Sequence, residues 1–289
     1  GSFVIGVAAT ILQVVLNLYL TVCRIGKTTA LQRQMIGGTS NSIGMAIAPL
    51  VISYLIFHGT PLHDIVTKQF IIPLIILILI MLIITILVGK TQMPSIDNVR
   101  QVPGEKFDKS VWSFRNLKLG VWGIFFYVGI EVAVGANVNM YASELGGSFA
   151  SNATHMAALY WGLLLLGRFL GSFIKQVPSE KQLVIASIGA IVLLVLAMLT
   201  ANPWILTLIG FFHSIMWPAI FTLATDQLGK YTTKASGVLT MGVIGGGIIP
   251  LLQGIFADVM GGNWLWTWLL VIAGEAYILY YGLNGYKQH

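Results

Sequence analysis

Hydrophobic residues follow one another in this chain in long stretches that contain no charged side chain. The stretch 70–89 reads FIIPLIILILIMLIITILVG, and several similar stretches follow it. About 20 helical residues cross the roughly 30 Å hydrocarbon core of a bilayer. A signal peptide could account for one such stretch, but not for a series. The pattern therefore predicts an all-α, polytopic membrane protein.

The same pattern predicts about nine transmembrane helices joined by short connections with turn residues, such as Ala201-Asn202-Pro203. The predicted spans are 3–22, 33–57, 70–89, 117–141, 153–174, 182–200, 203–225, 235–257 and 264–285. One connection, 90–116, is long, polar and contains prolines, which is typical of an exposed linker. We expect a partial N-terminal half at 1–89 with three spans, this central linker at 90–116, and a six-helix C-terminal half at 117–289.

Composition agrees with a membrane protein. Of the 289 residues, 56% are hydrophobic and 9% are charged, and the mean hydropathy is +0.85. A soluble domain carries about 25% charged residues. The net charge of +6 does not indicate nucleic-acid binding here, because nearly all the basic residues fall on one side of the predicted membrane.

The basic residues predict the orientation of the chain. When successive connections are assigned to alternate sides, all but one of the 16 Lys and Arg residues fall on one side, and only Lys68 falls on the other. By the positive-inside rule, the linker 90–116 and the C-terminus are cytoplasmic. Two aromatic clusters fit interfacial belts at the ends of the last span: Trp264, Trp266 and Trp268 outside, and Tyr280, Tyr281 and Tyr286 inside.

Polar residues in the first two spans are candidates for substrate binding. Gln13 and Asn17 lie four positions apart, so they share one helix face. Their amides could bind hydroxyl groups of a sugar, or bond to a neighbouring helix. Asn41 lies in a run of small residues, from Gly37 to Gly44, that favours close helix packing. Asn41 itself is large enough to reach a substrate.

Glu131 lies in the middle of the predicted span 117–141. Inserting an acidic side chain at the centre of a bilayer costs about 2.5–3.5 kcal/mol on insertion scales. Such a residue therefore indicates a function or a bonding partner. It is a candidate for proton coupling and for binding substrate; alternatively it is a structural partner of Asn139, two turns further on, which is also a candidate. Glu275, in the last span, is a weaker candidate.

The segment Phe211–Ile220 (FFHSIMWPAI) supplies an aromatic candidate. Trp217 could stack on the apolar face of a sugar, and Pro218 could break the helix beside a site. The alternative is a packed aromatic at a kink. His213 is a minor candidate, because a lone histidine is more often a hydrogen-bonded core residue. Gln253 follows a run of three glycines. Like the other amides, it could bind a sugar hydroxyl or bond to a neighbouring helix.

Enzymatic chemistry is not indicated. The sequence has no zinc-protease motif, phosphate-binding loop or clustered catalytic triad, and its single cysteine, Cys23, excludes an internal disulfide and a multi-cysteine metal site. We expect no enzyme activity, metal or cofactor.

Several segments resemble the fucose–proton symporter family of the major facilitator superfamily, which includes bacterial glucose/galactose transporters. They occur in family order: ILQVVLNLYL at 11–20, Arg33 followed by Asn41-Ser42, FYVGIEVAVG at 126–135, LGRFLGSFI at 166–174, SIMWPAIF at 214–221 and GVIGGGIIPLLQGIFAD at 242–258. The resemblance implies the major facilitator fold, with the nine spans equivalent to helices four to twelve of twelve. Because three spans precede the linker where the resemblance implies six, and the chain opens with Gly1-Ser2 rather than Met, we expect that the first three helices are missing, either by truncation or in a natural short form.

The resemblance implies a secondary active transporter that works by alternating access. Gln13 is neutral as in the glucose/galactose branch, and Glu131 matches that branch, so a hexose or related monosaccharide is the expected substrate. Cation symport is expected, with a proton favoured over sodium. The alternatives are a non-transporting membrane sensor or a truncated, inactive transporter fragment. We expect a multi-pass protein of the cell membrane, most simply the bacterial inner membrane, with no obligate protein partner.

Overall fold

The computed structural model describes residues 2–23, 26–50, 71–91 and 107–288, and these residues form helices with no strand among them. The α-helices are α1 Ser2–Val22, α2 Ala30–Leu50, α3 Ile71–Lys90, α4 Arg115–Leu145, α5 Gly147–Ser151, α6 Ala153–Gly171, α7 Ser179–Thr200, α8 Pro203–His213, α9 Met216–Thr225, α10 Thr232–Thr240, α11 Gly245–Val259 and α12 Trp268–Tyr280. Short helical turns lie between or after them: η4 Val111–Ser113, η5 Gly229–Tyr231, η6 Met241–Ile244, η7 Leu265–Thr267 and η8 Tyr281–Gly285. The predicted all-α class is confirmed.

The chain divides into two compact units. One consists of Gly1–Thr39 together with Asp97–His289, and the other of Ser40–Ile96. The first unit contains α1, the first part of α2, and every helix from α4 onward. The second contains the rest of α2 and α3. The predicted division at the linker stays a prediction, because 92–106 lies outside the described residues.

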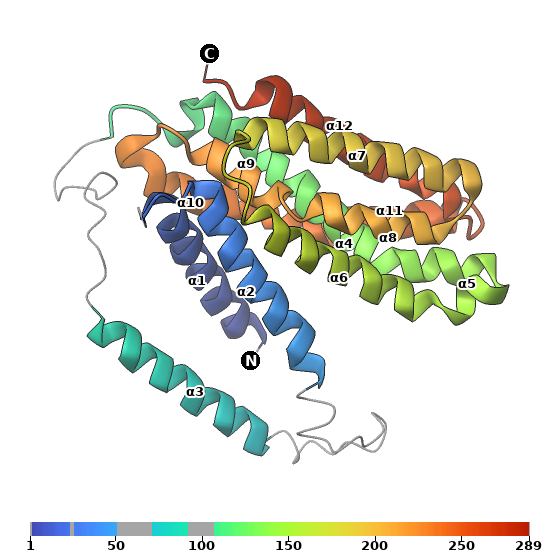
Figure 1. Cartoon of the computed structure of the whole chain (residues 1–289), viewed down its shortest axis with the longest axis horizontal. Helices are drawn as coiled ribbons and strands as arrows, with labels where there is room; N and C mark the ends of the chain where they lie inside the picture. Colours follow the sequence, from blue (N-terminus) through green and yellow to red (C-terminus); the bar gives the residue numbers. More distant parts are fainter. Residues whose placement is uncertain (1, 24–25, 51–70, 92–106, 289) are drawn as a thin grey trace. The chain divides into compact units, whose positions relative to one another are not determined.

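In the first unit, α4 is the helix on which most of the others pack. It contacts α6, α8, α9, α11 and α12, while α7 covers α8 and α12 (Figure 1). The buried side chains of this group, among them Tyr127, Ile130 and Phe221, form one continuous hydrophobic core. α4 therefore presents its middle, where Glu131 lies, to several neighbouring helices at once.

Several predicted spans match single helices closely, whereas the span predicted at 235–257 comprises α10, η6 and α11. The prediction 70–89 corresponds to α3, and 182–200 lies within α7. Among the described residues, six helical stretches are long and apolar enough to cross a membrane. The count of about nine spans stays a prediction, and residues 51–57 of the predicted second span lie outside the described residues.

The span predicted at 203–225 is one apolar stretch long enough to cross a membrane, and it consists of two helices. α8 ends at His213 and α9 begins at Met216, so the break falls at Ser214 and Ile215. Pro218 explains the position, because its ring clashes with the carbonyl four residues earlier, that of Ser214, and it has no N–H to donate. The Ser214 hydroxyl donates to the carbonyl oxygen of Phe211 at 2.6 Å, which satisfies an acceptor near the break.

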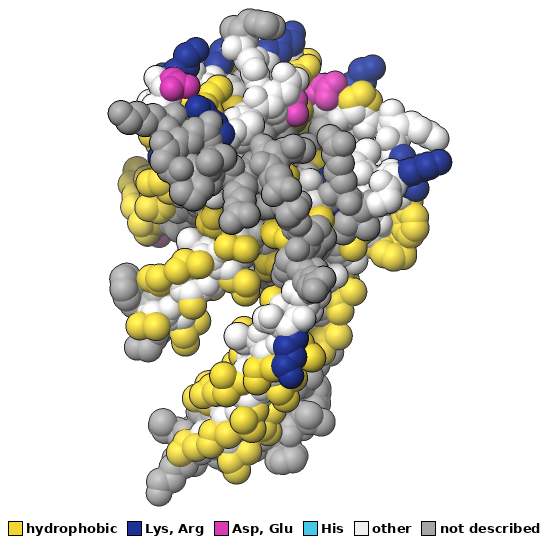
Figure 2. All heavy atoms as spheres, turned by 90° about the vertical axis from the view of Figure 1, so that its left-hand side faces the viewer, with side chains coloured by type: hydrophobic (Ala, Val, Ile, Leu, Met, Phe, Trp, Pro, Cys, Tyr) yellow, Lys and Arg dark blue, Asp and Glu magenta, His cyan; other side chains and the backbone are white. Residues whose placement is uncertain are grey.

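The outer surface of the helices is largely apolar, and in Figure 2 hydrophobic side chains (yellow) cover much of the helices in view. Exposed side chains include Val192 on α7 and Leu251 on α11, as expected for helices that face lipid. The predicted outer aromatic belt is only partly formed by exposed rings. Trp266 is 48% exposed, but Trp268 is fully buried and packs edge-on against Tyr141, with 5.9 Å between ring centroids.

Candidate functional site

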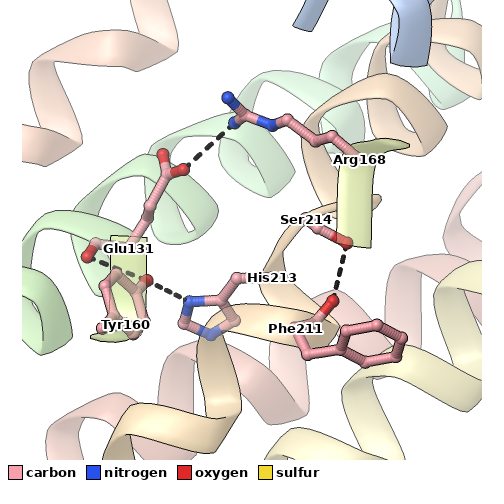
Figure 3. A network of polar contacts seen from close by, with 6 residues as sticks. All are labelled: Glu131, Tyr160, Arg168, Phe211, His213 and Ser214. Atoms are coloured by element: carbon pink, nitrogen blue, oxygen red, sulfur yellow. Dashed lines mark hydrogen bonds and ion pairs between the residues drawn. The ribbon is translucent and has the colours of Figure 1, made fainter. Parts of the chain in front are cut away.

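An ion pair joins α4 and α6 inside the first unit. Nη2 of Arg168 donates to Oε1 of Glu131 at 3.3 Å, and the two side chains keep 11% and 14% of their surface exposed (Figure 3). An acid inside an apolar bundle is costly without a partner of opposite charge. Arg168 is that partner, and the residual exposure leaves the pair open to solvent or a ligand.

The stem of Arg168 lies against α2. A Cβ atom added at Gly38 would stand 3.2 Å from Cδ of Arg168, closer than ordinary contact. The absence of a side chain at Gly38 therefore gives the arginine room to lie against α2 while it reaches Glu131. The glycine-rich run of the second predicted span thus has a packing role at this position.

A second set of polar contacts starts at the backbone of Glu131. The hydroxyl of Tyr160 on α6 donates to the carbonyl oxygen of Glu131 at 3.1 Å and lies 2.6 Å from Nδ1 of His213 on α8 (Figure 3). The other ring nitrogen of His213, Nε2, is 2.6 Å from Oε1 of Glu275 on α12. Both the His213 and Glu275 side chains are fully buried. Four helices therefore meet in one polar chain.

Close helix packing brings these groups together. A Cβ atom at Gly210 would lie 2.3 Å from the carbonyl oxygen of Tyr160, so only glycine lets α8 approach α6 this closely. His213 follows one turn later on α8. The ring of Tyr127 on α4 meets His213 edge-on at 6.2 Å and closes the other side.

The pair of Glu131 and Arg168 can perform two kinds of chemistry. A carboxylate accepts hydrogen bonds and a guanidinium donates them, so together they can bind the hydroxyl groups of a polyol. Protonation of the carboxylate would also remove its charge and weaken its bond to Arg168. A proton and a polar ligand can thus influence the same pair.

The predicted residues of the first two helices lie in different surroundings. Gln13 is exposed on α1, and Asn17 is half-buried one turn later. The carbonyl oxygen of Asn17 accepts from Nε2 of Gln34 at 2.8 Å, which ties α1 to α2. Asn41 is exposed and belongs to the second compact unit.

The predicted site residues of the C-terminal half differ in their contacts. Gln253 is fully buried; it accepts from Nδ2 of Asn137 at 2.9 Å and donates to the hydroxyl of Thr267 at 3.0 Å. The Oδ1 atom of Asn139 is buried without a hydrogen bond among the described residues, and Glu131 bonds to Arg168 instead of Asn139. Trp217 is partly buried and stacks on Phe221, with 6.1 Å between ring centroids.

Sequence reasoning missed Arg168 and Tyr160 and gave little weight to His213 and Glu275. In the sequence, Arg168 is one of the basic residues assigned to the inner side and part of the segment 166–174, and neither observation gives it a partner. Its position inside a predicted span was the available signal, because a buried arginine needs an acidic partner. Tyr160 carried no comparable signal. In the described part of the chain, no group of three or more His, Cys, Asp or Glu residues could hold a metal ion.

Comparisons with known proteins agree with this architecture. The Brucella abortus glucose/galactose transporter is 34% identical over 295 residues, which cover 99% of this chain and 71% of that protein. The L-fucose-proton symporter of Escherichia coli is 28% identical over 199 residues, covering 65% of this chain and 45% of that protein.

The fold has a close structural match as well. The crystal structure of the transporter FucP in its outward conformation superimposes with a TM-score of 0.80 at 23% identity, covering 95% of this chain and 72% of FucP. The family model described as Major Facilitator Superfamily matches residues 2–250. This chain, a multi-pass membrane protein, therefore belongs to the Major Facilitator Superfamily.

Proposed function

We propose that this protein carries a hexose or a related monosaccharide across the membrane together with a proton, by alternating access. The observation that carries the proposal is the partly exposed pair of Glu131 and Arg168 inside an otherwise apolar helix bundle. The relatives support the substrate class, because they are named as glucose/galactose transporters and as an L-fucose-proton symporter.

Glu131 is the proposed group at which sugar and proton are coupled. In its ionised form it bonds to Arg168, and in its protonated form it can donate to a sugar oxygen. A proton on Glu131 thus exchanges an internal ion pair for a ligand contact. Gln13, Asn17 and Asn41 are proposed to bind the sugar from the N-terminal helices, and Asn139, Trp217 and Gln253 from the C-terminal ones. For Gln253, this requires its amide to leave Asn137 or Thr267.

The proposed location is the bacterial inner membrane, with the linker and the C-terminus in the cytoplasm. The contacts support a common membrane side for these segments. Arg115, at the start of α4, donates to the carbonyl oxygens of Asn284 at 2.8 Å and Lys287 at 2.9 Å. At the opposite end of α4, Oε2 of Glu144 accepts from the backbone N–H of Trp264 at 2.9 Å.

Uptake of labelled glucose, galactose and fucose by cells that lack their own hexose carriers tests the proposal. We expect the protein to concentrate at least one of these sugars and Glu131→Gln to abolish concentration, because the titratable group is gone. Glu144→Gln is the matched control, since Glu144 is exposed and glutamine can still accept from Trp264. Sugar binding without uptake would favour a sensor, and unimpaired concentration by Glu131→Gln would contradict the role of Glu131.

A further inference from the structure

Behind the Glu131 and Arg168 pair lies a buried chain of titratable side chains that the proposed function does not use. Tyr160, His213 and Glu275 come from α6, α8 and α12 and follow one another at 2.6 Å and 2.6 Å. Two such short contacts in series each require a proton between the two atoms. The position of these protons follows from counting donors.

The Tyr160 hydroxyl has one proton and two neighbours that could accept it. One is the carbonyl oxygen of Glu131 at 3.1 Å, which can only accept; the other is Nδ1 of His213. When Tyr160 donates to the carbonyl, Nδ1 must carry a proton and donate to the hydroxyl oxygen. A further proton then lies between Nε2 and Glu275, on one atom or the other. In this state His213 and Glu275 together are electrically neutral.

Removal of one proton changes the direction of the bonds. Nε2 keeps its proton and donates to the Glu275 carboxylate, while Nδ1 becomes an acceptor. Tyr160 must then turn its hydroxyl proton from the Glu131 carbonyl to Nδ1. The proton count of the pair is thus linked to a hydrogen bond at the backbone of Glu131, the residue proposed to bind sugar and proton.

The surroundings favour the neutral, proton-loaded state. Oε2 of Glu275 is buried and has no hydrogen bond among the described residues, and a net charge is costly in an apolar interior. The titratable and charged groups near the pair are Tyr127 and Glu131 on α4 and Tyr160 and Arg168 on α6. On α7 the charged residues lie in the first turn. α9 has no charged residue, and α11 has only Asp258, near its end.

We propose that His213 and Glu275 share one exchangeable proton and form a second proton-carrying site of this transporter, with Tyr160 as the positioning residue that links its occupancy to α4 at Glu131. The inference rests on the proposed proton-coupled transport. Loading adds one proton from water to the pair. Release returns that proton to water; the hydrogen bond of Tyr160 changes its acceptor, and no other covalent bond forms or breaks.

Transport by purified protein in liposomes separates this role from a structural one. In Glu275→Gln, sugar accumulation driven by a pH gradient should fall by about tenfold or more, while exchange of sugar for sugar stays within about twofold of wild type. During exchange of sugar for sugar, each carrier returns with its proton still bound. Exchange therefore does not require the pair to release its proton. Asp258→Asn, which changes an exposed acid of α11, is the control. Loss of both activities in a folded Glu275→Gln variant, or of neither, would overturn the proposal.

Nitrogen-15 NMR of the histidine rings tests the same proposal in the wild-type protein, and so decides it even if Glu275→Gln does not fold. The chain has five histidines, and the signals of His213 are those that disappear in His213→Gln. When the pH of the sample is varied, we expect Nδ1 of His213 to carry a proton in the loaded state of the pair and to be unprotonated in the other state. An Nδ1 that is unprotonated throughout, or that never loses its proton, would overturn the proposal. Failure of the proposed transport function would leave this NMR result unchanged, so the two failures are distinguishable.

Discussion

Arg168 reaches across from α6 to bind Glu131 on α4, although the two residues are 37 positions apart in the sequence, at 3.3 Å from Nη2 to Oε1. This single contact changes the interpretation of Glu131 from a solitary acid in a membrane span to half of an ion pair. Because the pair is only partly exposed, its two members should depend on each other for stability.

A double-mutant cycle measures that dependence. Removing one member of a buried pair lowers the free energy of unfolding by about 3–5 kcal/mol, because the other charge stays behind. This pair keeps some exposure to solvent, so we expect a loss near the lower end of that range or below it. Arg168→Met should therefore be less thermally stable in detergent than wild type, and adding Glu131→Gln should restore part of the loss. A double variant less stable than Arg168→Met would contradict an ion pair.

Arg33 should be essential for the connection between α1 and α2. It is 6% exposed, and its guanidinium donates to the carbonyl oxygens of Leu20, Thr21 and Thr28, each at 2.7 Å. Two of these carbonyls belong to the last turn of α1, which has no intrahelical partner for them. A lysine cannot reach three acceptors in different directions.

We therefore expect Arg33→Lys to lower the melting temperature clearly, with about 1.5–3 kcal/mol lost for each charged hydrogen bond that is not replaced. Arg115→Lys is the matched control: Arg115 also donates to backbone carbonyls, but its hydrogen bonds are exposed to solvent. Equal melting temperatures for the two variants would argue against a special role of Arg33.

Gly210 should tolerate no side chain. An alanine there would place Cβ 2.3 Å from the carbonyl oxygen of Tyr160, and backbone atoms cannot move aside locally. We expect Gly210→Ala to separate α8 from α6 and to lower both stability and transport. Gly254→Ala, on α11, meets no atom within 4 Å and should be neutral or stabilising by about 0.5–1 kcal/mol. Thermal denaturation of both variants provides the comparison.

Thiol labelling tests the orientation. In a Cys23→Ala background, Lys109→Cys and Ser148→Cys place one exposed thiol at either end of α4. We expect an impermeant reagent to label position 148 in intact cells and position 109 only after the membrane is opened, in accordance with the positive-inside rule. The reverse pattern would show the opposite orientation.

Much of the fold could be predicted because each span is defined locally. A stretch such as 70–89 needs no knowledge of its neighbours to be recognised as a helix that crosses lipid. Pro218 also predicted the break between α8 and α9, although the sequence did not show that the break would fall directly after His213.

The site was harder to predict because its contacts connect separate helices. Helical periodicity shows that two residues share a face, as for Gln13 and Asn17, but not which helix that face meets. His213 and Glu275 are 62 positions apart, and each alone resembled an ordinary core residue or a peripheral acid. Only the packing of α4 and α7 against both α8 and α12 shows that they form a pair.

The most direct test of proton-coupled sugar transport is a pH measurement inside liposomes that contain the purified protein and a pH-sensitive dye, with no ion gradient at the start. Addition of glucose or galactose outside should acidify the interior, because each sugar that enters brings a proton. Glu144→Gln should respond like wild type, and Glu131→Gln should not respond. Sugar entry without a change in internal pH, or an unaltered response in Glu131→Gln, would contradict the account.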